Sequence, residues 1–221
     1  MTDRNLLSPD AAVYGVIMND RASLDRLAVA AAQPPYKALP QAPVLYVKPR
    51  NTWMRAADRI VLPQGADRAE IGAVVGLRMG RDAARLHPDA ALDAVDACLL
   101  AADLSLPHAN YYRPAIREKS FDGSLPLALL AGVAPGDVST LILRTWLDDQ
   151  PVAERSLDDL IRGPAQLLAD VSEFMTLRQG DVLLLGVVYQ SPVASAGSRV
   201  RVEVPGLAQL AFTVAAKETS A

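Results

Sequence analysis

The chain has 221 residues, of which 51% are apolar and 21% charged, and its formal net charge is −3. These proportions indicate one globular domain, and the charge argues against nucleic-acid or anionic-membrane binding, because both need a clustered positive field. The single cysteine, Cys98, excludes an intramolecular disulfide. One cysteine and two histidines cannot fill a closed Cys/His zinc site, so any metal would be held mainly by carboxylates, which favours Mg²⁺, Ca²⁺ or Mn²⁺.

The ends of the chain show no targeting signal. Met1–Asp10 is polar and has no apolar core like that of a signal peptide. We expect residues 1–12 to form a short disordered lead and residues 13–221 to form one domain. The longest apolar runs, such as Val182–Val188, are too short to span a bilayer. These features favour a cytoplasmic protein in a reducing compartment.

The first half of the chain alternates short apolar runs with two amphipathic segments. In chain order it predicts a strand at Val13–Met18, a helix at Ala22–Ala32, strands at Val44–Lys48, Ile60–Leu62 and Ile71–Leu77, and a helix at Pro88–Val95. Ser23 is the expected cap of the first helix, and Pro88 fits a first helical turn. Asp96–Asp103 could continue the second helix or form a strand, because its periodicity fits both.

The second half of the chain is richer in strands. In chain order it predicts a strand at Thr140–Leu147, helices at Ser156–Ile161 and Pro164–Leu177, and strands at Val182–Val188, Arg199–Val204 and Leu207–Ala215. Strands outnumber helices and do not alternate with them regularly. The sequence therefore predicts an α+β, mostly β protein built on a large mixed or antiparallel sheet system, not a doubly wound nucleotide-binding fold.

Two carboxylates stand at the ends of buried runs. Glu70 precedes Ile71–Val75, and Asp103 follows Cys98–Ala102. A charge at the end of a buried strand is costly unless it is paired or bound to a metal, although each residue taken singly could mark the start of solvent exposure. His108 lies close to Asp103 in the sequence.

Two cationic clusters follow predicted strands. One is Lys48–Thr52, with Lys48 and Arg50, and the other is Tyr111–Gly123, with Arg113 and Lys119. Arginine offers a bidentate fork to a carboxylate and lysine offers a point charge, so the loops suit an anionic small molecule. The alternative is that both clusters are solvated loops held by local turns. The sequence has no glycine-rich phosphate loop and no nucleophile elbow.

Several longer segments, taken together and in order, resemble the fumarylacetoacetate hydrolase family over about residues 13–216. They are Pro35–Ala38, Leu45–Thr52, Ala102–Pro107, Tyr111–Ile116, Lys119–Gly123 and Ser172–Leu177. The resemblance implies a mixed β roll or sandwich with a few flanking helices, usually dimeric. It also implies a divalent ion, Mg²⁺ or Mn²⁺, that binds a 2-oxo acid and stabilises the enolate formed on loss of CO₂ or of a proton.

The resemblance assigns roles to individual residues. Glu70 and Asp103 match two metal ligands, and Lys119 matches the catalytic lysine of a Lys-Ser-x-Asp segment. Lys48, Arg50, Arg113 and Lys119 are the expected contacts for the substrate carboxylates. Arg68 stands where the family has its first ligand glutamate, so either its side chain points away or the metal site is weakened.

Three other positions depart from the family pattern. Pro107 and His108 replace an arginine and an aspartate, Gly186-Val187-Val188 replaces a Gly-Thr-Pro turn, and Asn19-Asp20-Arg21 stands where a lid histidine is expected. These departures leave two hypotheses. The first is an enzyme of 4-hydroxyphenylacetate catabolism that decarboxylates 5-carboxymethyl-2-oxo-hex-3-ene-1,7-dioate, with possible isomerisation of 2-hydroxyhepta-2,4-diene-1,7-dioate. The second is a catalytically impaired partner subunit of a metal-complete homologue. In either case we expect a homodimer or pairing with a homologous subunit.

Overall fold

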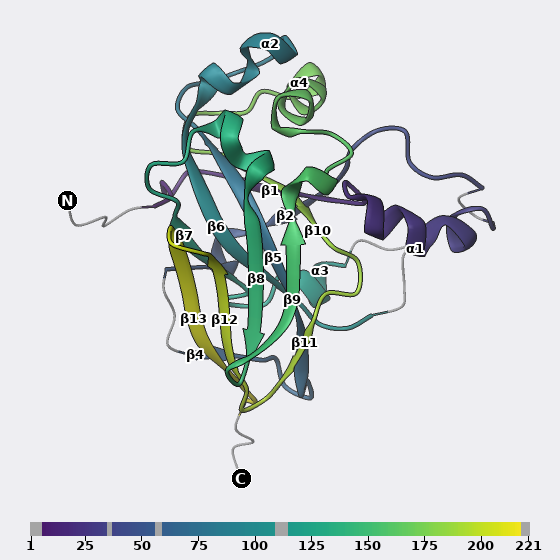
Figure 1. The fold of residues 1–221 in the computed structure, drawn as a ribbon, viewed down its shortest axis with the longest axis vertical. Helices are drawn as coiled ribbons and strands as arrows, with labels where there is room; N and C mark the ends of the chain where they lie inside the picture. Colours follow the sequence, from purple (N-terminus) through teal and green to yellow (C-terminus); the bar gives the residue numbers. More distant parts are fainter. Residues whose placement is uncertain (1–5, 35–36, 56–58, 109–114, 218–221) are drawn as a thin grey trace.

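The computed structural model describes residues 6–34, 37–55, 59–108 and 115–217, which form two packed β-sheets with short helices around them (Figure 1). The larger sheet has the strand order β2 (Val44–Lys48), β1 (Val13–Ile17), β10 (Val182–Val187), β5 (Arg68–Met79), β6 (Val95–Ser105), β7 (Leu125–Leu129) and β3 (Trp53–Arg55), with β11 (Val193–Ser195) beside β5. The smaller sheet has the order β4 (Arg59–Val61), β13 (Ala208–Ala215), β12 (Arg199–Val204), β8 (Ile142–Leu147) and β9 (Gln150–Ser156). Both sheets mix parallel and antiparallel pairs, as the α+β, mostly β expectation required.

The helices are short and lie outside the sheets. They are α1 (Arg21–Ala31), α2 (Pro88–Ala91), α3 (Ile116–Lys119) and α4 (Pro164–Phe174), with 3₁₀ turns η1 (Arg50–Thr52), η2 (Leu92–Ala94), η3 (Pro135–Thr140) and η4 (Leu157–Asp159). Helices α2 and α4 cover one end, and α1 projects from the side (Figure 1). Within the described residues, no helix is long and apolar enough to cross a membrane.

Most predicted strands are confirmed within a few residues, and the structure decides the ambiguous segment. Asp96–Asp103 lies in β6, because its alternate residues reach two different cores. The helix expected at Ser156–Ile161 is one 3₁₀ turn, and the first helix is capped by Asp20 rather than Ser23, since the Asp20 carboxylate accepts from the Ser23 amide at 2.8 Å. Strands β3, β7, β9 and β11 were not predicted.

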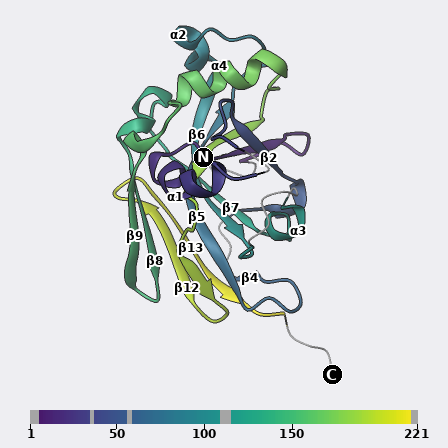
Figure 2. The same ribbon diagram turned by 90° about the vertical axis from the view of Figure 1, so that its right-hand side faces the viewer.

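The alternation of side chains along the larger sheet separates two apolar cores. On one face Ile71 and Leu100 pack against Leu143 and Val202 of the smaller sheet. On the other face a smaller core includes Val74, Leu99, Leu125 and Leu184. Figure 2 shows the smaller sheet on the left and α3 on the right, so α3 lies on the side of the second core.

The larger sheet must curl, because its two end strands are neighbours in the chain. Strand β2 ends at Lys48 and β3 begins at Trp53, with only η1 and Pro49 between them. The Trp53 indole Nε1 donates to the Lys48 carbonyl at 2.8 Å, which brings the two ends of the sheet together. The second core and the polar groups described below therefore lie within the curl. Leu6, part of the segment expected to be a disordered lead, is buried in this core.

Candidate functional site

Asp103 lies near the end of β6 and is buried among three polar side chains. Its Oδ1 atom is 2.8 Å from the Lys48 ammonium, and its Oδ2 atom is 3.2 Å from the Lys119 ammonium. The Tyr46 hydroxyl donates to Oδ2, and the Lys119 ammonium lies 4.6 Å from the centre of the Tyr46 ring. The structure therefore brings three residues named from the sequence, Asp103, Lys48 and Lys119, into one cluster and adds Tyr46.

The Lys48 ammonium is fully buried and surrounded by oxygen atoms. Besides its ion pair with Asp103, it donates to the Lys119 carbonyl at 2.6 Å, the Ser124 hydroxyl at 3.0 Å and the Leu104 carbonyl at 3.2 Å. Three N–H groups thus face four protein oxygens, so they are directed inward and not toward a bound molecule. Lys119 differs, because 14% of its side chain is exposed.

The charges in this cluster shift one another's pKa. Burial alone would raise the pKa of Asp103, but Lys119 and Lys48 outweigh burial and hold it below its ordinary value. Burial lowers the pKa of Lys48, although Asp103 opposes that shift. Burial, reinforced by Asp103, raises the pKa of Tyr46 well above its ordinary value, so the hydroxyl stays protonated and donates.

Glu70 lies on the same face of the sheet as Asp103. In the β5–β6 register Glu70 is opposite Ser105 and Gly72 is opposite Asp103, and residues two apart on a strand share a face. Burial raises the pKa of Glu70, and the nearby charges of Lys119 and His108 oppose that shift. The two predicted carboxylates, Glu70 and Asp103, therefore lie on one face of the sheet, and His108 is close enough to Glu70 to affect its pKa.

Arg68, which replaces the family's first ligand glutamate, lies two residues before Glu70 on β5, so its side chain starts from the same face of the sheet. Its side chain is 62% exposed and lies 3.8 Å from the carboxylate of Asp67. The side chain is thus largely in solvent, and under either alternative the position supplies no oxygen donor.

The described residues do not fit a divalent ion. No group of three or more His, Cys, Asp or Glu side chains is found among them. Both oxygens of Asp103 lie within ion-pair distance of an ammonium group, so a further positive ion placed there would be repelled, although Oδ1 accepts no hydrogen bond from the described residues. Asp103 and Glu70 alone fall short of the ligand set that Mg²⁺ or Mn²⁺ needs.

The other predicted substrate contacts, Arg50 and Arg113, lie outside the Asp103 cluster or outside the described residues. Arg50 is exposed on η1. Arg113 lies outside the described residues. Val187, in the altered turn, is close to the strand pair, since a Cβ on Gly72 would lie 2.8 Å from its Cγ1 atom. Tyr46 and Ser124 were missed, although Tyr46 could have been found, because it stands two residues before Lys48 on the same strand face.

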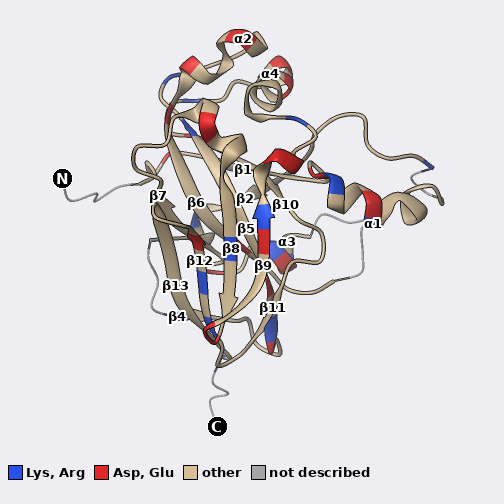
Figure 3. Cartoon of the chain, viewed as in Figure 1, with Lys and Arg blue, Asp and Glu red and all other residues tan. Residues whose placement is uncertain are grey.

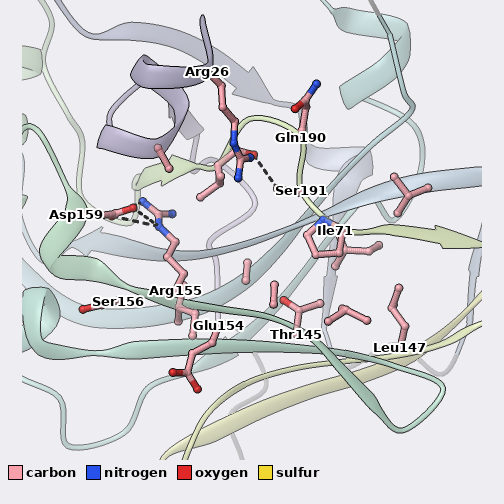
Figure 4. Close-up of a pocket in the computed structure, with 18 of the residues that line it drawn as sticks. Arg26, Ile71, Thr145, Leu147, Glu154, Arg155, Ser156, Asp159, Gln190 and Ser191 are labelled. Carbon is pink, nitrogen blue, oxygen red and sulfur yellow. Dashed lines mark hydrogen bonds and ion pairs between the residues drawn. The ribbon is translucent and has the colours of Figure 1, made fainter.

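A separate groove of about 670 Å³ opens on the other face of β5 (Figure 4). Ile71, next to Glu70, lines it, and alternation directs the two side chains to opposite faces. Arg155 lies at its wall, where it pairs with Asp159 at 3.0 Å and donates to the Gly186 carbonyl at 2.7 Å. The polar groups at this wall are thus engaged with one another, and the Asp103 cluster remains the candidate site.

Fold and site together define a curled mixed-sheet protein with a buried lysine–carboxylate cluster. The family model described as "Fumarylacetoacetate (FAA) hydrolase C-terminal" matches residues 12–215, and the chain belongs to this family. The 4-hydroxyphenylacetate degradation bifunctional isomerase/decarboxylase of Salmonella dublin is 38% identical over 206 residues, which are 93% of this chain and 47% of that protein. The chain therefore spans about half the length of this curated relative.

Solved structures share the fold. The 5-carboxymethyl-2-hydroxymuconate delta-isomerase of Mycobacterium smegmatis has a TM-score of 0.77 at 23% identity, with 95% of this chain and 80% of that chain covered. The fumarylpyruvate hydrolase of Pseudomonas aeruginosa, solved with Mn²⁺ and pyruvate, has a TM-score of 0.76 at 19% identity, with 93% and 90% covered. At these identities the likeness concerns the fold alone. The family and the mixed β fold expected from the sequence are confirmed.

Proposed function

We propose that this chain is one half of an isomerase/decarboxylase of 4-hydroxyphenylacetate catabolism, and that its site binds an oxo-diacid through Lys119. The proposed reaction is decarboxylation of 5-carboxymethyl-2-oxo-hex-3-ene-1,7-dioate, with isomerisation of 2-hydroxyhepta-2,4-diene-1,7-dioate as a second activity. The observation that carries the proposal is the partly exposed Lys119 ammonium, which is fixed at 3.2 Å from Asp103 on the face that also carries Glu70. The isomerase/decarboxylase relative supports the pathway.

The chemistry asks for a fixed positive charge. When CO₂ leaves, the electron pair of the broken bond passes through the conjugated chain to the 2-oxo oxygen, where negative charge develops. A preorganised ammonium beside that oxygen stabilises the transition state more than the ground state. Lys119 supplies this charge in the proposal, while Arg50 and Arg113 are proposed to bind the distal carboxylates.

Neither Mg²⁺ nor Mn²⁺ carries a step in this proposal. The resemblance predicts such an ion, and the Pseudomonas hydrolase was solved with Mn²⁺. In this chain Glu70 and Asp103 would be its candidate ligands, but Lys48 and Lys119 already hold both oxygens of Asp103. The positive charge at the site therefore comes from lysine in this proposal.

The proposed function also carries an expected cell compartment, oligomeric state and set of partners. We propose a cytoplasmic protein that works as a homodimer or with a homologous subunit and binds neither nucleic acid nor membrane. In Figure 3 the described Lys and Arg are interspersed with Asp and Glu along the ribbon.

Product analysis tests the proposal. The purified chain is incubated with the oxo-diacid, and CO₂ and the dienoate product are measured for the natural sequence, Lys119→Met and the exposed-lysine control Lys217→Met. We expect turnover by the natural chain and by Lys217→Met, and loss of at least about a hundredfold in Lys119→Met, as for removal of an oxyanion-stabilising donor. Turnover that survives in Lys119→Met contradicts the role of Lys119.

A second candidate function is a structural partner for a metal-complete homologue. Two observations favour it: Arg68 leaves the first ligand position without a carboxylate, and Val187 replaces the hydroxyl-bearing residue of the turn beside Gly72. The chain also covers only 47% of the Salmonella relative. If the chain alone is inactive but forms a defined complex with such a homologue and raises its activity, this second function replaces the first.

A further inference from the structure

The buried ammonium of Lys48 connects parts of the chain that are far apart in sequence. Lys48 ends β2, whereas its ion-pair partner Asp103 lies on β6. Its hydrogen-bond acceptors are the Leu104 carbonyl on β6, the Lys119 carbonyl at the end of α3 and the Ser124 hydroxyl just before β7. The Ser124 hydroxyl also lies 3.0 Å from the Lys119 carbonyl. The Lys48 ammonium therefore binds the backbone carbonyl of Lys119 and also contacts Asp103, the carboxylate that the Lys119 side chain contacts.

We propose that Lys48 is the positioning residue for Lys119, which holds that ammonium at the mouth of the site and leaves its charge available to an anionic ligand. This inference rests on the proposed function only in taking Lys119 as the group that meets the anion. Lys48 itself touches no ligand in the proposal, because its side chain is fully buried and its N–H groups face protein oxygens.

The charge balance of the cluster explains why Lys119 needs a second lysine beside Asp103 if its ammonium is to remain available to an anion. Asp103 has two oxygens, and each is held by a different lysine. Without Lys48, Lys119 would be the only counter-charge to a fully buried carboxylate, and it would be drawn inward to neutralise it. With Lys48 in place, the three groups carry a net positive charge, and Lys119 is the member that reaches the surface.

The first test measures anion binding with oxalate as the probe, using calorimetry on the full chain. Lys48→Met keeps an unbranched side chain one atom shorter than lysine and removes its charge, and Lys217→Met is the matched control at an exposed lysine. We expect oxalate affinity to fall at least about tenfold in Lys48→Met and to stay unchanged in the control. Lys48→Ala should regain affinity when n-propylammonium, which replaces the missing atoms, is added, and n-propanol should not restore it.

The second test follows Lys119 without any ligand. Mass spectrometry gives the rate at which acetic anhydride modifies each lysine. We expect Lys119 to react several times more slowly in Lys48→Met than in the natural chain, because its ammonium is then drawn inward to Asp103. If Lys48 variants do not fold, Ser124→Ala removes one acceptor of Lys48 and should slow acetylation of Lys119 to a smaller extent.

The outcomes separate the two proposals. Unchanged oxalate affinity and an unchanged Lys119 acetylation rate in a folded Lys48 or Ser124 variant overturn the positioning role. Recovery of thermal stability by n-propylammonium without recovery of oxalate binding also overturns it, because Lys48 would then act only on folding. If the natural chain does not bind oxalate at all, the proposed function is contradicted, while the acetylation rates still decide the role of Lys48.

Discussion

Gly15 of β1 and Tyr46 of β2 are register partners, and the Tyr46 ring lies across the space that a side chain at residue 15 would fill. A Cβ atom at that position would be 2.1 Å from the ring. The absence of a side chain at Gly15 thus allows the ring to reach across the strand and its hydroxyl to donate to Asp103. A glycine on one strand therefore sets the geometry of a buried carboxylate on another.

Gly15→Ala should displace the Tyr46 ring and destabilise the protein by about 1–3 kcal/mol, the usual range for overpacking a buried site. Urea unfolding measures the change. Gly136→Ala is the matched control, since a Cβ there would come no closer than 4.0 Å to Leu92. Equal stability of the two variants would show that the ring does not depend on Gly15.

Asp103→Asn should cost about 3–5 kcal/mol, because it leaves the Lys48 ammonium buried without its ionic partner. Asp96→Asn is the control: Asp96 pairs with Arg78 at 2.8 Å, but its side chain is 44% exposed, and such pairs contribute under about 1 kcal/mol. Chemical unfolding of both variants at neutral pH gives the comparison. A loss at Asp103 no larger than that at Asp96 would contradict the buried-pair argument.

The same carboxylate predicts a dependence of stability on pH. Burial would raise the pKa of Asp103, but Lys119 and Lys48 hold it below its ordinary value. Its stabilising contribution is therefore complete above the unfolded pKa of about 3.9 and is lost as the pH falls through the lower folded pKa. We expect acidification through this range to lower the free energy of unfolding more steeply in the natural chain than in Asp103→Asn. Parallel curves for the two proteins would count against it.

The alternation of apolar and polar residues, together with continuous apolar runs, was sufficient to predict the strands that have buried faces. Val200 and Val202 are buried on β12 as their period of two required. Strand β9 was missed because it lies at a sheet edge and is polar and exposed over most of its length, which leaves no apolar pattern. The site was found in part: carboxylates at strand ends and lysines in nearby motifs are visible in a sequence, whereas the direction of Lys48 into the curl depends on how the sheet closes.

Cys98 should be unreactive in the folded protein. The thiol is buried as expected for a small apolar side chain, and burial, reinforced by Asp137, raises its pKa to about 11. Little thiolate is then present at mildly alkaline pH, and thiolate is the reactive form. Labelling with a disulfide reagent should be negligible in the native state and complete in denaturant, where the sole cysteine provides its own control. Rapid labelling of native protein would mean that the β6 core opens readily.

Removal or addition of divalent metal should leave the stability of the chain unchanged. Asp103 is neutralised by Lys48 and Lys119, and Arg68 offers no oxygen in place of the missing ligand, so little binding free energy is available to an ion. An ion present at a free concentration of a hundred times its dissociation constant would stabilise the folded chain by about 2.7 kcal/mol. For a chain of this size, that raises Tm by roughly 5–10 °C. We expect a change below about 1 °C on adding EDTA, MgCl₂ or MnCl₂, compared with NaCl at equal ionic strength. A rise of several degrees with MnCl₂ that is absent in Glu70→Gln would place an ion beside Glu70 and contradict the assignment of the site's positive charge to lysine.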